Sequence, residues 1–204
     1  QIRAIQQVRP DARILLRVVI EPPKWWIDQH PEERIGWTLR PGTHIPEGVR
    51  QNPDDWKTPS YASEVWRRDA GERLRQLLQE LAASSEGGAV FALLVVGGQW
   101  HEWFYPRFEF EPDNGLAMTR HFRQWLRQKY ATDDALRTAW NKPDVTLDTA
   151  EVPGVPERFK TSERMFRDPQ KERQAIDYYK CHQGLVADVP IEFCRIAKEA
   201  WPRP

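Results

Sequence analysis

The sequence lacks the features that place a chain in several large functional classes. No apolar run approaches the roughly 20 residues that a helix needs to cross a bilayer. The 30 basic and 30 acidic side chains cancel to a formal net charge of zero, whereas nucleic acids and anionic membranes favour a basic excess. The first ten residues are polar and hold no apolar core of a signal peptide. We therefore expect neither a membrane nor a nucleic acid as the main partner.

Cysteines and known catalytic motifs are also scarce. Along one helix, Cys181 and Cys194 would lie about 20 Å apart, too far for a disulfide. We expect free, mostly buried thiols, which favours the cytoplasm without establishing it. No P-loop, GxGxxG or GxSxG pattern occurs, and the five histidines lack metal-ligand spacing. We read Glu109, Glu111 and Asp113 as a solvated loop edge, and we expect no cofactor and no metal.

Tryptophan, in contrast, is abundant, with ten in 204 residues. A large aromatic core accounts for several of them. Trp25, Trp26, Trp100 and Trp103 differ because they come just after apolar runs. Aromatic faces at such places can stack on the apolar face of a sugar or a base. Because the chain is neutral, a carbohydrate is the better choice of ligand.

The stretch 89–106, AVFALLVVGGQWHEWFYP, organises the rest of the interpretation. Its Val- and Leu-rich start predicts a strand buried on both faces, as in a parallel sheet. Gly97 and Gly98 then allow a turn or the close approach of a ligand. Glu102 follows among aromatic and hydrogen-bonding side chains. Because ligands bind at the ends of parallel strands in α/β folds, we take Glu102 as the centre of the site.

A second buried strand is predicted over 12–20, ARILLRVVI, and an amphipathic helix over 60–83. Strand, helix and strand in this order predict a βαβ unit. Arg17 within the apolar strand needs a partner: either it makes a buried ion pair, or it orients a carboxylate in the site. Further helices are predicted over 116–130, over 132–140 with Thr132 as N-cap, and from Asp168 towards Ala200.

Glu102 has a chemical use that fits its surroundings. A carboxyl group against aromatic surface is desolvated and can hold a proton near neutral pH. Glycoside hydrolysis requires such a proton donor together with a second carboxylate. The alternative is that Glu102 has only a structural role, as a salt-bridged glutamate at a strand end. Neither cysteine lies at a strand end beside a histidine, so a thiol nucleophile is disfavoured.

Five segments together resemble the middle part of family 42 glycoside hydrolases and their β-galactosidase-like relatives: ILLRVVIEPPKWW, PSYASEVWRRDAGERLRQLL, GGQWHEWFYP, FRQWLRQKYATDDALRTAW and KERQAIDYYKCHQGLVAD. The resemblance implies a (β/α)8 barrel and a retaining mechanism. It implies that Glu102 is the acid/base at the end of the fourth strand and that ILLRVVI is the third strand. The family commonly has asparagine where this chain has His101. Its nucleophile, a glutamate on the seventh strand, has no match here, and Glu21 is not supported in that role.

The resulting prediction is an α/β fold, a partial (β/α)8 barrel covering roughly strands 3 and 4 with flanking helices. We expect 1–204 to be one incomplete barrel segment, cut at both ends, with an irregular cover loop over 30–59. With one carboxyl group of the required pair, it should be inactive alone, and its unpaired strand edges favour association between copies. The expected substrate is a β-galactoside or a related β-linked sugar. The residues expected to shape its pocket are Gln99, His101, Trp103, Tyr105, Trp25 and Arg17.

Two rival interpretations remain open. The chain could be a non-catalytic carbohydrate-binding barrel domain, which the absence of a later strand-end glutamate would support. It could also be a structural barrel domain whose tryptophans form the core. Solvent exposure of Trp25 and Trp103 separates this last case from the others, because core residues should be buried.

Overall fold

The computed structural model describes residues 1–43, 58–98, 101–105 and 110–202. The chain folds into two compact units. The first unit consists of Gln1–Pro22, Val65–Pro106 and Val186–Pro204, and the second of Pro23–Glu64 and Arg107–Leu185. None of the helices in the described part of the chain is long and apolar enough to cross a membrane.

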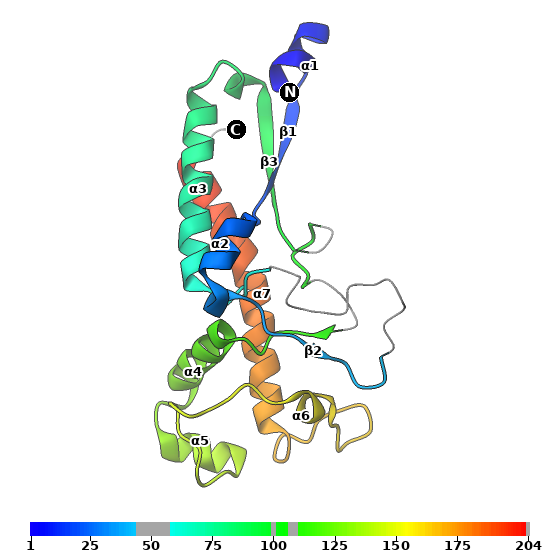
Figure 1. Cartoon of the computed structure of the whole chain (residues 1–204), viewed down its shortest axis with the longest axis vertical. Coiled ribbons are helices and arrows are strands. Elements are labelled where there is room, and N and C mark those ends of the chain that lie inside the picture. The colour runs from blue at the N-terminus through cyan, green and yellow to red at the C-terminus, as the bar shows by residue number, and fades with distance from the viewer. Residues whose placement is uncertain (44–57, 99–100, 106–109, 203–204) are drawn as a thin grey trace. The chain divides into compact units, whose positions relative to one another are not determined.

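The first unit contains the predicted strand–helix–strand order. Strands β1 (Ile14–Val19) and β3 (Val90–Val96) are parallel and lie side by side, and helix α3 (Glu64–Ala83) joins them in sequence (Figure 1). A 3-10 turn, η3 (Gly87–Ala89), leads into β3. The prediction of a βαβ unit is therefore confirmed, with its helix starting four residues later than expected.

The β1–β3 sheet has one covered face and one open face. Val18 and Val95, which pair across the strands, are buried. On the opposite face Leu15 is 53% exposed and Leu94 is 46% exposed. The prediction that both strands are buried on both faces is therefore wrong for this chain. The physical reason is that the sheet has two strands among the described residues, and no described segment covers its second face.

Helices complete the first unit. The apolar stripe of α3 buries Trp66, Leu74 and Leu78, as the spacing predicts. The second part of α7 (Arg173–Ala200) packs along α3 (Figure 1), where Trp66 meets Phe193 edge to face at 5.3 Å between ring centroids. Helix α1 (Ile2–Val8) precedes β1.

The second unit begins with α2 (Lys24–Gln29), followed by the 3-10 turn η1 (Pro31–Glu33). Strand β2 (Thr38–Leu39) then pairs antiparallel with β4 (Phe110–Glu111). The turn η1 and strand β2 correct the prediction of a wholly irregular loop over 30–59, of which residues 44–57 lie outside the described part. Two-residue strands leave no periodicity to read, so the sequence gives no sign of them.

Helices α4 (Leu116–Tyr130), α5 (Asp133–Trp140) and α6 (Val155–Phe159) form the rest of the second unit with the first part of α7. Thr132 caps α5 as predicted, accepting a hydrogen bond from the amide of Ala135 at 3.2 Å. Helix α7 starts at Arg173, later than the predicted Asp168. Asp168 instead closes a turn by accepting from the amide of Gln170, which satisfies the side chain before the helix begins.

Candidate functional site

The ends of β1 and β3 form the edge on which the sequence places the site. Because the strands are parallel, their carboxyl ends lie at the same edge of the sheet. The ladder continues past β1, where the Ile20 amide donates to the Val96 carbonyl at 2.7 Å. Glu21 and Glu102 therefore both follow strand ends at this edge. Both side chains are exposed.

The segment after β3 folds into a turn with an unusual backbone. Gly98 has a positive φ of 70°, and two residues that are not glycine also have positive φ values, His101 at 66° and Trp103 at 59°. A left-handed conformation costs a residue with a side chain about 1–2 kcal/mol. Hydrogen bonds hold the turn: the His101 amide donates to Gly98 at 3.1 Å and the Trp103 amide to Gly97 at 2.8 Å. The two strained residues flank Glu102 directly.

Trp103 is anchored to the protein. Its indole stacks on Phe193 of α7, with 5.8 Å between ring centroids and 17° between planes. Its N–H donates to the Val95 carbonyl at 3.4 Å. The six-membered ring also lies against Gly97, where an added Cβ would approach it to 2.9 Å. Glycine at position 97 is thus required by the close approach of the indole.

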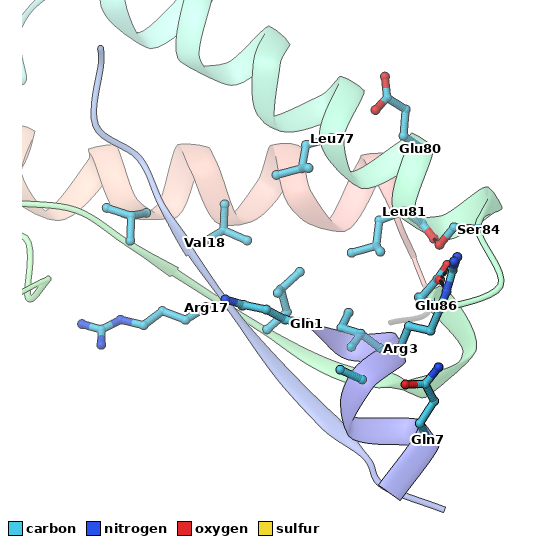
Figure 2. Close-up of a pocket in the computed structure, with 14 residues that line it drawn as sticks. Gln1, Arg3, Gln7, Arg17, Val18, Leu77, Glu80, Leu81, Ser84 and Glu86 are labelled. Atoms are coloured by element: carbon cyan, nitrogen blue, oxygen red, sulfur yellow. Dashed lines mark hydrogen bonds and ion pairs between the residues drawn. The ribbon is translucent and has the colours of Figure 1, made fainter. Parts of the chain in front are cut away.

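Arg17 reaches across to the turn from the neighbouring strand. Its Nη2 hydrogen-bonds to Nδ1 of His101. The guanidinium is exposed, and in Figure 2 it extends away from the other labelled side chains. Within the described part of the chain, Arg17 therefore makes no buried ion pair. The other alternative, that Arg17 orients a carboxylate, stays a prediction.

Glu102 itself is exposed between these two anchored neighbours. The desolvation expected from the surrounding aromatic side chains is therefore not present in this chain. The reason is that Trp103 turns its ring towards Phe193 and Gly97 instead of covering the carboxyl group.

The other predicted pocket residues are placed as follows. Tyr105 is half-buried in the first unit, whereas Gln99 and Trp100 lie outside the described residues. Trp25 belongs to α2 in the second unit, and its side chain is 60% exposed. With Trp25 exposed and Trp103 half-buried, the interpretation of these tryptophans as ordinary core residues is disfavoured.

A wide groove of about 1060 Å³ lies elsewhere in the first unit (Figure 2). Leu16 and Val18 of β1 and Leu77 and Leu81 of α3 give it apolar walls. At one end Arg3 of α1 forms an ion pair with Glu86. Arg17 of β1 and the carboxylates Glu80 and Glu86 also line the groove, whereas Glu102 is not among the described residues that do.

A buried polar network in the second unit escaped the sequence analysis. Asp113 is fully buried, and its carboxylate accepts from the Ser60 hydroxyl at 2.5 Å and from the amides of Gly36 and Gly115 at 2.9 Å. Burial raises the pKa of Asp113 to about 6, although these hydrogen bonds oppose the shift. The Asp-Asn-Gly sequence is a turn signal that could have indicated the contact with Gly115.

Charged and aromatic side chains surround this carboxylate. Arg158 is 1% exposed, and its Nη1 donates to the Pro112 carbonyl at 2.7 Å. Tyr178 accepts from the Asp113 amide at 2.8 Å and stacks on His182. Burial, followed by the nearby Arg158 charge, lowers the pKa of His182 to about 4. The imidazole is therefore neutral at physiological pH.

Glu111 is also buried, accepting from Tyr179 at 3.0 Å and from Arg40 at 2.9 Å. The prediction of a solvated loop edge is thus wrong for Glu111 and Asp113, and Glu109 lies outside the described residues. Dedicated hydrogen-bond donors explain why these acids tolerate burial. Over the described ranges no group of three or more metal-ligating side chains occurs. Cys181 is buried and Cys194 exposed, and both are free.

The chain matches no protein-family model and no curated protein sequence. It does match solved structures of β-galactosidases. The enzyme from the psychrophilic Marinomonas ef1 has a TM-score of 0.59 at 19% identity, covering 92% of this chain and 26% of that chain. The enzyme from Bacillus circulans sp. alkalophilus has a TM-score of 0.60 at 16% identity, covering 93% and 26%. Gan42B, a GH42 β-galactosidase, has a TM-score of 0.60 at 15% identity, covering 99% and 27%.

These matches confirm the resemblance to family 42 β-galactosidases at the level of the fold. The chain is a mixed α/β structure, mostly helical with two small sheets, and nearly all of it superposes on part of such enzymes. It spans about a quarter of their length.

Proposed function

We propose that this chain supplies the acid/base part of a retaining glycosidase that acts on β-galactosides or related β-linked sugars. In this proposal β1 and β3 are the third and fourth strands of a (β/α)8 barrel, and Glu102 is the general acid and then the general base. The observation that carries the proposal is the position of Glu102, which follows a parallel strand in a chain whose fold matches β-galactosidases.

The open face of the sheet supports the barrel. Leu15 and Leu94 are exposed here, whereas parallel strands are normally buried on both faces. Further strands of a barrel would cover these two side chains. A retaining site also needs two carboxyl groups about 5–5.5 Å apart. We therefore place the nucleophile on a segment outside these 204 residues and expect the isolated chain to be inactive.

The test is the leaving-group dependence of a Glu102→Gln variant in the full-length protein. A substrate with a poor leaving group, such as phenyl β-galactoside, needs the proton and should lose turnover by about 10²–10⁴-fold. The 2,4-dinitrophenyl substrate releases 2,4-dinitrophenolate, a leaving group that needs no proton. The rate at which its glycosidic bond is cleaved should therefore change little. Glu21→Gln is the matched control, because Glu21 is an exposed acid at the neighbouring strand end. Near-normal hydrolysis of the phenyl substrate by Glu102→Gln removes Glu102 from the role.

A carbohydrate-binding domain without chemistry is the second candidate, favoured by the exposed indole of Trp25. It predicts that the full-length protein binds galactosides but hydrolyses neither substrate. In that case Trp25→Ala weakens binding and Glu102→Gln does not.

A further inference from the structure

We propose that the turn carrying Glu102 is clamped on both flanks, and that Trp103 and Arg17 are positioning residues for its carboxyl group. The inference rests on the proposed function, because the position of Glu102 matters for turnover only if Glu102 transfers a proton. It assigns Trp103 a different role from the sugar contact that the sequence predicts.

The backbone shows that the turn is held by its surroundings. Two neighbours of Glu102, one on each side, adopt left-handed conformations that are unfavourable for residues with a Cβ. Such conformations persist only where other contacts enforce them, and they cluster at functional sites. His101 and Trp103 each make such contacts, on opposite flanks of Glu102.

Trp103 forms the first half of the clamp. Phe193 occupies a face of its ring, the Val95 carbonyl takes its N–H, and Gly97 packs against its six-membered ring. A ring face and an N–H are the groups that an indole offers to a sugar, and here protein atoms engage both. Trp103 therefore links Glu102 to the end of β3 and to α7.

Arg17 forms the second half. Its guanidinium has N–H donors and no acceptor, so Nδ1 of His101 must be unprotonated where the two meet. Because Arg17 is on β1, this contact ties the turn to the neighbouring strand.

The clamp is tested by removing its support without touching the turn. Phe193→Leu removes the ring under Trp103. Trp66→Leu is the matched control, because it removes the other aromatic partner of Phe193 and leaves the Trp103 stack in place. Both are measured in the full-length protein with the phenyl and 2,4-dinitrophenyl β-galactosides.

A displaced Glu102 donates its proton poorly. Phe193→Leu should therefore lower kcat/KM for the phenyl substrate by about 10-fold or more, part of the 10²–10⁴-fold that general acid catalysis supplies, and change the 2,4-dinitrophenyl value little. Arg17→Met should show the same selectivity, with partial rescue in Arg17→Lys. Equal losses on both substrates in Trp103→Phe would show a sugar contact instead and overturn the proposal.

Hydrogen exchange gives a readout that does not depend on activity. The Trp103 amide, bonded to Gly97, should exchange about 10-fold faster in Phe193→Leu than in Trp66→Leu, because local opening becomes easier. Equal exchange rates in the two variants would refute the clamp. If Phe193→Leu does not fold, Gly97→Ala, which pushes the indole away, provides the same comparison. If the exchange rates of these two variants differ but Glu102→Gln shows no leaving-group selectivity, the clamp stands and the proposed function is refuted.

Discussion

Asp113 and His182 should make opposite contributions to stability as the pH changes. Burial raises the pKa of Asp113 from 3.8 to about 6 and lowers that of His182 from 6.5 to about 4. Both groups are buried and both contact Tyr178. Replacing one of them at a time, with Asp113→Asn and His182→Gln, should expose the contribution of the replaced residue as a difference from wild type.

The size of each contribution follows from the shifts. One pKa unit corresponds to about 1.4 kcal/mol, so each group contributes about 3 kcal/mol. The folded state binds the Asp113 proton more tightly than the unfolded state does. Its stabilisation is therefore complete below pH 3.8 and is lost as the pH rises through 6. His182 is held neutral, so its stabilisation is present above pH 6.5 and is lost as the pH falls through 4.

Urea unfolding between pH 3.5 and 7.5 measures this balance. The free energy of unfolding of Asp113→Asn, relative to wild type, should rise by about 3 kcal/mol from pH 3.5 to 7. The relative free energy of His182→Gln should fall by about the same amount over this range. Using differences removes the contributions of all other titrating groups. Stability curves for Asp113→Asn and wild type that stay parallel across the range would refute the reasoning.

Three further predictions concern packing, capping and thiol chemistry. Trp66→Ala should lower the free energy of unfolding by about 3–5 kcal/mol in urea titrations, because it empties a fully buried site beside Phe193; Trp66→Phe should cost clearly less. Thr132→Ala should cost about 1 kcal/mol in the same assay through loss of the α5 cap, with recovery in Thr132→Ser. Iodoacetamide should label the native chain once, at exposed Cys194, because Cys181 is buried and burial raises its pKa to about 12; mass spectrometry showing equal labelling would contradict this.

Regular elements with a strong period could be predicted from the sequence. The 3.6-residue stripe through Trp66, Leu74 and Leu78 predicts α3, and the apolar runs predict β1 and β3. The start of α7 could not be predicted in this way. An Asp-Pro pair is a good helix start locally, but Asp168 satisfies its carboxylate within a preceding turn, which the pattern does not distinguish.

The candidate site was predictable as a set of residue types and not as an arrangement. Glycines before a polar, aromatic segment indicate a turn after the strand, and Glu102 follows β3 in the structure. The sequence does not show that Trp103 faces Phe193, a residue 90 positions away that α7 brings to the turn. It also does not show that Asp113 is buried, because Ser60 and Gly36, two of its donors, are distant in sequence.

The most informative disagreement concerns β1 and β3. Apart from Arg17, their side chains are apolar on both faces, yet the described residues cover one face and leave Leu15 and Leu94 exposed. A strand exposed to solvent on one side normally alternates polar and apolar residues. These strands do not, so their composition fits a structure with more strands than the described residues provide. The match to about a quarter of each β-galactosidase structure points the same way. The error in predicting burial thus supports the barrel in the proposed function, because a sheet that needed no further strands would have one polar face.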